Sequence, residues 1–201
     1  MRGPLVRSLA LGAALALAGT LAAAQTRPFA PTTQLAGQTL QLNGAGTRFR
    51  SVVRVYDLAL YTPTKVSTPE ELLALRGPLR LAFVALRDIP SDQLGRAMVQ
   101  GMRDNAPAQH SMAFTNHMGT MGRIFSATQT LKTGDSFSMD YVPGKGATFY
   151  INGVARGDPV SDPGFMDTLL RIWVGARPAD AQLKERLLGR QPAARDMNSP
   201  G

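Results

Sequence analysis

Arg48 and Tyr56 are the side chains in this sequence whose types and spacing could build a binding site. A turn centred near Val52 would place them opposite each other on one face of a hairpin, because cross-strand partners project to the same side. A guanidinium provides two parallel charged donors and a phenol provides another hydrogen bond, so together they suit a carboxylate buried among apolar groups. From spacing alone, a solvent-facing arginine beside a core tyrosine is the better interpretation.

Methionine is concentrated in two expected helices, one starting near Ser91 and the other covering about residues 108–128. Because methionine commonly fills irregular gaps, an adaptable core is the main interpretation of this cluster. The alternative is that these helices line a pocket for a flexible apolar chain, and the two interpretations overlap because such a pocket would be part of the core. The residues assigned to the possible pocket lining are Met98, Met102, Met118 and Met121.

Other chemistry has little support in the sequence. The chain has no cysteine, which excludes disulfides, thiolate metal sites and a cysteine nucleophile. His110 and His117 lack carboxylates at metal-ligand spacing, so we expect neither a metal nor a cofactor. The Gly44-x-Gly46 pair lacks the third glycine and the following helix of a dinucleotide fingerprint. Nucleic acid is not an expected partner despite the net charge of +8, because no basic run is interleaved with aromatic residues.

The N-terminal residues have the features of a secretory signal. Arg2 and Arg7 precede an apolar run over 9–18, and small residues end at Ala24, where a signal peptidase would cleave. The apolar run is too short to span a bilayer comfortably, since a span takes about 20 residues. We therefore predict a signal peptide over 1–24, an extended leader over 25–36, a folded domain over 37–189 and a flexible tail over 190–201. The expected location is periplasmic or secreted, without stable membrane insertion after cleavage.

The rest of the chain predicts strands, helices, strands and helices in that order. Alternating patterns indicate strands over 39–43, 49–60, 79–86, 136–142 and 147–151, with the first strand interrupted at Gly44–Gly46. Asn152-Gly153 is a strong hairpin signal that leads into a strand over 154–156. Helices are expected over 70–75 (capped by Thr68), from a Ser91 cap, over 108–128, from Asp162 to Trp173 and over 179–188. This order predicts an α+β fold with an antiparallel sheet covered on one face by helices.

Three segments carry a resemblance to a known family. Gly44-Ala45-Gly46-Thr47-Arg48, the strand around Val55-Tyr56 and Leu60-Tyr61, and Leu170-Arg171-Ile172-Trp173-Val174-Gly175 resemble the chalcone isomerase-like superfamily, in particular its bacterial exported branch. The resemblance covers about residues 35–189. It implies an open-faced β-sandwich, in which a large antiparallel sheet lies under a layer of helices.

The superfamily includes plant enzymes that close a chalcone into a flavanone and members that bind fatty acids without catalysis. Arg48 matches an arginine of both kinds, whereas Tyr56 lies where the fatty-acid binders have a carboxylate-contacting tyrosine and the isomerases a threonine. The tyrosine and asparagine that the isomerases use near their first long helix correspond to Leu94 and Gly101 here, and this departure puts isomerisation in doubt.

The sequence and the resemblance together leave three hypotheses. The leading one is a non-catalytic periplasmic binder of a fatty acid or similar amphiphilic carboxylate, held between sheet and helices with its head group at Arg48 and Tyr56. The alternative is an intramolecular lyase of the chalcone isomerase type, with a flavonoid-like ligand and Arg48 stabilising an oxyanion. The third is a structural or partner-binding protein of the cell envelope.

Overall fold

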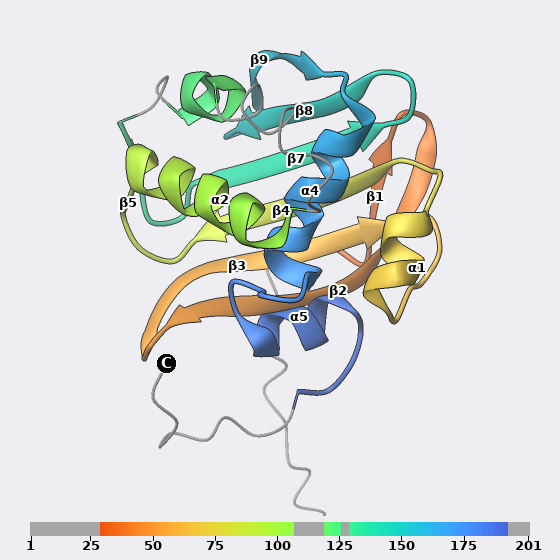
Figure 1. Cartoon of the computed structure of the whole chain (residues 1–201), viewed down its shortest axis with the longest axis horizontal. Helices are drawn as coiled ribbons and strands as arrows, with labels where there is room; N and C mark the ends of the chain where they lie inside the picture. The colour runs from red at the N-terminus through yellow and green to blue at the C-terminus, as the bar shows by residue number, and fades with distance from the viewer. Residues whose placement is uncertain (1–28, 107–118, 126–128, 193–201) are drawn as a thin grey trace, which may run out of the picture.

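The computed structural model describes residues 29–106, 119–125 and 129–192 (Figure 1). Seven antiparallel strands form one sheet in the order β1-β2-β3-β4-β7-β8-β9, and β5 (Ile89–Pro90) pairs separately with β6 (Thr130–Leu131). The strands of the large sheet are β1 (Thr32–Leu35), β2 (Gln38–Arg50), β3 (Val53–Thr62), β4 (Leu79–Ala85), β7 (Ser136–Val142), β8 (Gly146–Ile151) and β9 (Val154–Val160).

The labelled helices lie on one face of this sheet, as Figure 1 shows. They are α1 (Pro69–Ala74), α2 (Ser91–Asn105), α4 (Pro163–Val174) and α5 (Ala181–Leu187), and a further helical segment covers 119–125. The predicted α+β open-faced sandwich is confirmed. No helix among the described residues is both long enough and apolar enough to cross a bilayer.

The two faces of the sheet carry different cores. Tyr56, Leu58 and Leu60 of β3 point into the main core under the helices, and the alternate residues Ala59 and Tyr61 belong to a small cluster on the opposite face. This alternation follows from the period of two in an extended strand. The predicted leader over 25–36 contributes to the opposite face: its residues 32–35 form β1, and Phe29 packs against the small cluster.

Strand β2 continues through Gly44–Gly46, so the predicted interruption there was wrong. The irregularity lies one residue earlier, at a bulge between the pairs Leu42–Tyr61 and Gly44–Leu60 that leaves Asn43 without a partner strand residue. The Asn43 side chain donates to the carbonyls of Val66 (3.0 Å) and Leu187 (2.7 Å) and accepts from the Val66 amide (2.8 Å). This buried amide therefore joins β2 to the loop before α1 and to the end of α5.

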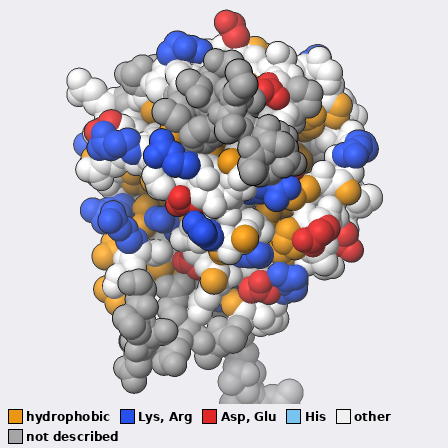
Figure 2. Space-filling model, viewed as in Figure 1, with side chains coloured by type: hydrophobic (Ala, Val, Ile, Leu, Met, Phe, Trp, Pro, Cys, Tyr) orange, Lys and Arg blue, Asp and Glu red, His pale blue; other side chains and the backbone are white. Residues whose placement is uncertain are grey.

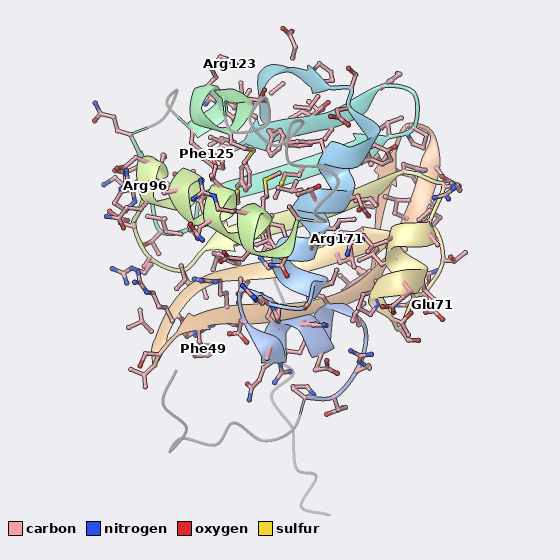
Figure 3. The ribbon with its side chains drawn as sticks, viewed as in Figure 1. Phe49, Glu71, Arg96, Arg123, Phe125 and Arg171 are labelled. Carbon is pink, nitrogen blue, oxygen red and sulfur yellow. The ribbon has the colours of Figure 1, made fainter. Side chains whose placement is uncertain are left out.

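The glycines of β2 allow helix α5 to lie directly on the strand. A β-carbon at Gly44 would stand 1.9 Å from the carbonyl oxygen of Arg186, and one at Gly46 would stand 2.6 Å from the Arg186 side chain. Asp180 caps α5 by accepting from the amides of Gln182 and Leu183, and it also accepts from the Phe49 amide at 3.0 Å. Figure 3 labels Phe49 on β2 near this helix.

The predicted helix starts were only partly correct. The capping box of α1 is present, with the Thr68 hydroxyl accepting from the Glu71 amide and the Glu71 carboxylate accepting from the Thr68 amide. Ser91, in contrast, is the first residue of α2 and not its cap, because Pro90 takes the cap position and provides no side-chain bond. Of the helix expected over 108–128, residues 119–125 are helical, and 107–118 and 126–128, with both histidines, lie outside the described residues.

Candidate ligand-binding site

A second bulge sets the register of Arg48 against Tyr56. The hairpin turns at Ser51 and Val52, where Ser51 has a φ of 54°, and Arg50 pairs with Val53. Without irregularity this register would place Arg48 opposite Val55. The bulge between the pairs Phe49–Arg54 and Arg48–Tyr56 moves the partner by one residue, and the predicted pairing of Arg48 with Tyr56 is thereby confirmed.

Arg48 lies over the ring of Tyr56, with its guanidinium carbon 5.8 Å from the ring centroid. This distance allows a cation–π interaction. The phenol is buried, and its ring meets Phe83 edge-on with 5.2 Å between centroids. No carboxylate in the described part of the chain forms an ion pair with Arg48. Its charge is therefore available to a ligand.

The Tyr56 hydroxyl retains a hydrogen that it can donate. The oxygen accepts from the indole Nε1 of Trp173 at 2.9 Å, and no described residue accepts from the hydroxyl. Burial raises the pKa of Tyr56 to about 12, since the phenolate would lose its hydration, and it outweighs the opposing effects of Arg48 and Trp173. The side chain is thus a neutral donor at physiological pH, which is the form that can bond a carboxylate.

A cavity of about 220 Å³ opens beside this pair, between the sheet and helices α2 and α4. Apolar side chains from both helices form much of its wall, including Leu94, Met98 and Trp173. The full lining is Arg48, Arg50, Val55, Tyr56, Arg87, Asp88, Ile89, Pro90, Gln93, Leu94, Ala97, Met98, Ile172, Trp173 and Ala179.

Only some of the residues predicted to line the pocket do so in the structure. Met98 lines the cavity together with Arg48 and Tyr56, whereas Met102 and Met121 are buried in the main core and are not among the lining residues. Helix α2 packs against α4, and Phe125 in the segment of Met121 contacts Phe137 of β7, so side chains fill that part of the interior. Met118 lies outside the described residues.

Leu94 and Gly101, which the resemblance aligns with the isomerase tyrosine and asparagine, have other roles in this fold. Leu94 lines the cavity with an apolar side chain. Gly101 lies where α2 meets α4, since a β-carbon there would come within 2.9 Å of Ile172. Neither side chain brings a hydrogen-bonding group to the cavity.

The mouth of the cavity is rich in positive charge. Arg48, Arg50 and Arg87 line it together with one carboxylate, Asp88. Asp88 accepts from Lys132 at 2.9 Å and from the Thr133 amide at 3.0 Å, and the Lys132 bond lowers its pKa. Figure 2 shows Lys and Arg side chains at the left edge of the molecule, above the hydrophobic side chains at the lower left. An anionic head group is thus favoured at this mouth.

Sequence reasoning missed several residues of this mouth and wall. Trp173 had a signal, since it lies in the third resembling segment, but nothing in the sequence linked it to Tyr56, which is 117 residues away. Arg50 and Arg87 had no local signal at all. Their convergence depends on the hairpin and on the end of β4 lying side by side.

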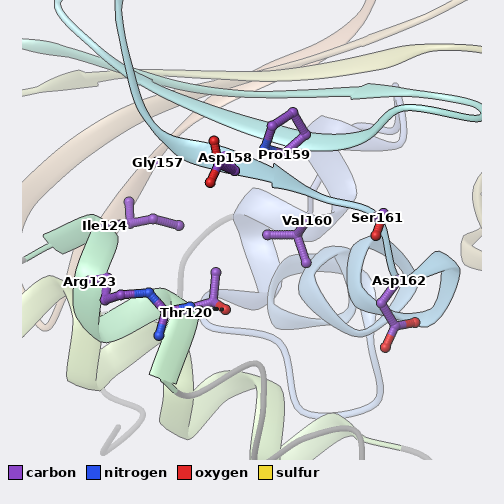
Figure 4. Close-up of a pocket in the computed structure, with 9 residues that line it drawn as sticks. All are labelled: Thr120, Arg123, Ile124, Gly157, Asp158, Pro159, Val160, Ser161 and Asp162. Atoms are coloured by element: carbon purple, nitrogen blue, oxygen red, sulfur yellow. Dashed lines mark hydrogen bonds between the residues drawn. The ribbon is translucent and has the colours of Figure 1, made fainter.

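A larger hollow of about 520 Å³ lies elsewhere, between segment 119–125 and the end of β9 (Figure 4). Asp158 and Asp162 stand on the β9 side of this hollow, and Arg123 and Thr120 on the helical side. Two carboxylates against one arginine do not favour an anionic ligand, so the smaller cavity is the better candidate for an amphiphilic carboxylate. The described residues contain no group of three or more His, Asp or Glu side chains suited to a metal ion.

The fold and the cavity together define an open-faced α+β sandwich with an interior cavity beside an arginine and a buried phenol. A model of the chalcone isomerase-like family matches residues 22–189, and the chain belongs to this family. The crystal structure of a fatty-acid binding protein from Arabidopsis thaliana is similar, with a TM-score of 0.58 and 12% sequence identity. The similarity covers 80% of this chain and 90% of the plant protein. The comparison with curated proteins found no match.

Proposed function

We propose that this protein is a non-catalytic periplasmic binder of a fatty acid or a similar amphiphilic carboxylate. One observation carries the proposal. At the wall of a largely apolar cavity, Arg48 lies over the buried phenol of Tyr56, and among the described residues neither the guanidinium has a carboxylate partner nor the phenol hydrogen an acceptor. A carboxylate in this position would accept from both groups, and its acyl chain would extend along α2. The similar structure of a fatty-acid binding protein supports the same class of ligand.

The magnitudes are sufficient for reversible binding. A hydrogen bond to a charged group contributes about 1.5–3 kcal/mol, and each buried methylene about 0.8 kcal/mol. The cavity of about 220 Å³ exceeds the roughly 150 Å³ of an engineered apolar cavity that holds benzene. It thus has room for the head group and the first part of an acyl chain, and a longer chain would require Met98 and Leu94 to change rotamers.

The proposed location rests on the N-terminal segment. Arg2, Arg7, the apolar run and the small residues before Gln25 match an export signal, and a binder in the periplasm would meet fatty acids released from the envelope.

Replacing Arg48 is the direct test of the site. Arg48→Ala should weaken fatty-acid binding about 10-fold to 100-fold, because it removes the charged donor, as measured by titration of a fluorescent fatty acid. Its fold should survive, since the native side chain contributes only a cation–π contact of about 0.5–1 kcal/mol to the protein itself. Arg76→Ala is the matched control: Arg76 is exposed and does not line the cavity, so this variant should bind fatty acid normally. Unchanged affinity in the Arg48 variant would overturn the assignment.

Tyr56→Phe should weaken binding less, about 2-fold to 10-fold, because it removes one neutral donor.

Native mass spectrometry of the purified protein gives an independent readout, since a copurifying lipid would appear as an added mass. Consumption of a chalcone on mixing would instead favour the intramolecular lyase. An interior that takes up neither lipid nor chalcone would favour the envelope structural protein.

A further inference from the structure

The turn of the β2–β3 hairpin exposes two aliphatic side chains. Val52 is 79% exposed and Val53 is 42% exposed, whereas most large apolar side chains in the described residues are buried. Tight turns usually carry Gly, Asn, Asp or Ser at such positions, because these residues suit the backbone and interact with water. Val52, which lies in the turn, therefore has no local structural reason, whereas Val53 begins β3 and pairs with Arg50.

Arginines surround this tip. Arg50 and Arg54 flank the turn in sequence and are exposed, and Arg48 and Arg87 line the cavity mouth beside it. None of the four forms an ion pair with a carboxylate in the described residues. The nearby acids already have partners, since Asp57 accepts from Thr47 at 2.5 Å and Asp88 from Lys132. In Figure 2, hydrophobic side chains lie at the lower left, where Figure 1 places the turn of the β2–β3 hairpin, and Lys and Arg side chains lie above them at the left edge.

We propose that the hairpin tip docks on the surface of an anionic phospholipid bilayer. The valines would enter the boundary between head groups and acyl chains, and the arginines would contact lipid phosphates, which they can bond in a two-pronged manner. Charge of a single sign around an aliphatic tip complements an anionic lipid surface better than a protein surface of mixed charge. Each arginine near such a surface strengthens binding about fivefold.

Docking would also place the mouth of the cavity at the lipid surface, because Arg48, Arg50 and Arg87 line that mouth. An amphiphile could then pass between bilayer and cavity without crossing water. This consequence rests on the proposed function, whereas the docking itself rests on the exposed valines and the arginines.

The test is co-sedimentation of the processed chain, from Gln25 onward, with vesicles. We expect binding to vesicles of phosphatidylcholine mixed equally with phosphatidylglycerol, little binding to phosphatidylcholine alone, and weakening by salt because exposed charges are screened. Equal binding to both kinds of vesicle, or binding to neither, would overturn the proposal.

Two variants with matched controls test the residues. Val52→Asp should reduce vesicle affinity at least tenfold, because it places a carboxylate at the tip, and Val154→Asp, at a valine that is 57% exposed on another hairpin, should leave it unchanged. Arg54→Gln should reduce affinity about fivefold, whereas Arg76→Gln should not. Circular dichroism would check that each variant is folded. Equal losses in a variant and its control would contradict docking through this tip.

Fatty-acid titration without vesicles separates this inference from the proposed function. Val52 and Arg54 do not line the cavity, so their variants should bind fatty acid normally in solution. Docking without any fatty-acid binding would overturn the proposed function alone. Fatty-acid binding without docking would overturn only the membrane proposal.

Discussion

At the scale of single residues, Tyr56 has a structural role and a proposed binding role. Its oxygen satisfies the buried indole of Trp173, its ring packs against Phe83, and its hydrogen remains available beside Arg48. A phenylalanine would keep the ring contacts but would leave the indole without a partner, which costs about 1–3 kcal/mol for a buried donor. The same side chain therefore links the stability of the core to the chemistry of the site.

The raised pKa of Tyr56 predicts a loss of stability at high pH. The ordinary pKa is about 10 and the folded value about 12, so the unfolded chain releases its proton first as pH rises. The stabilisation is complete below about pH 10 and disappears by about pH 12, with a full value of about 2–3 kcal/mol. Between pH 9 and pH 11, the free energy of unfolding in urea should fall more for the unsubstituted protein than for Tyr56→Phe. Identical losses would contradict a buried, neutral phenol.

At the scale of elements, the packing of helix α5 against the sheet depends on two glycines and one bulge in β2. Gly44 and Gly46 leave space for the backbone and side chain of Arg186, and Asn43 bonds to the last turn of the helix. Since Asp180 joins the start of the same helix to Phe49, α5 is attached to β2 at both ends. Nearby Ala179 lines the cavity, so this attachment also shapes the site.

Gly44→Ala should therefore destabilise the protein by about 2–4 kcal/mol, because the added methyl group would collide with the backbone of α5. Gly122→Ala is the matched control: a β-carbon there meets nothing within 4 Å, and alanine favours the helical segment by up to about 1 kcal/mol. Thermal and urea unfolding would measure both variants. A stable Gly44 variant would show that α5 moves away from β2 at little cost.

At the scale of the whole molecule, the open-faced architecture leaves an interior between one sheet and one layer of helices. The cavity lies near the edge of this interior, where the β2–β3 hairpin extends past the helices. Ligand entry and membrane contact would thus share one end of the protein. Over β7 and β8, the interior between the sheet and the helices is filled by aromatic side chains such as Phe137 and Phe149.

Export adds a prediction at the same scale. In a bacterial host, the chain should be recovered from the periplasm with Gln25 as its first residue, because the small residues at positions 22 and 24 suit a signal peptidase. Intact mass and cell fractionation would measure this. Replacing Ala22 and Ala24 together by phenylalanine should leave the signal attached. A cytoplasmic chain that begins at Met1 would contradict the prediction.

The sequence by itself determined the class of the fold, the helix cap at Thr68 and the hairpin whose two strands carry Arg48 and Tyr56. These features follow from turn residues, caps and the period of side chains, which act over short distances along the chain. It did not determine the continuous β2 strand, the true start of α2 or the separation of Met98 from Met102 and Met121. The tertiary structure alone decided that Trp173 bonds to Tyr56, that α5 covers Gly44 and that Arg87 joins the mouth. Such contacts join segments far apart in the chain, and only the packing of the complete domain selects among them.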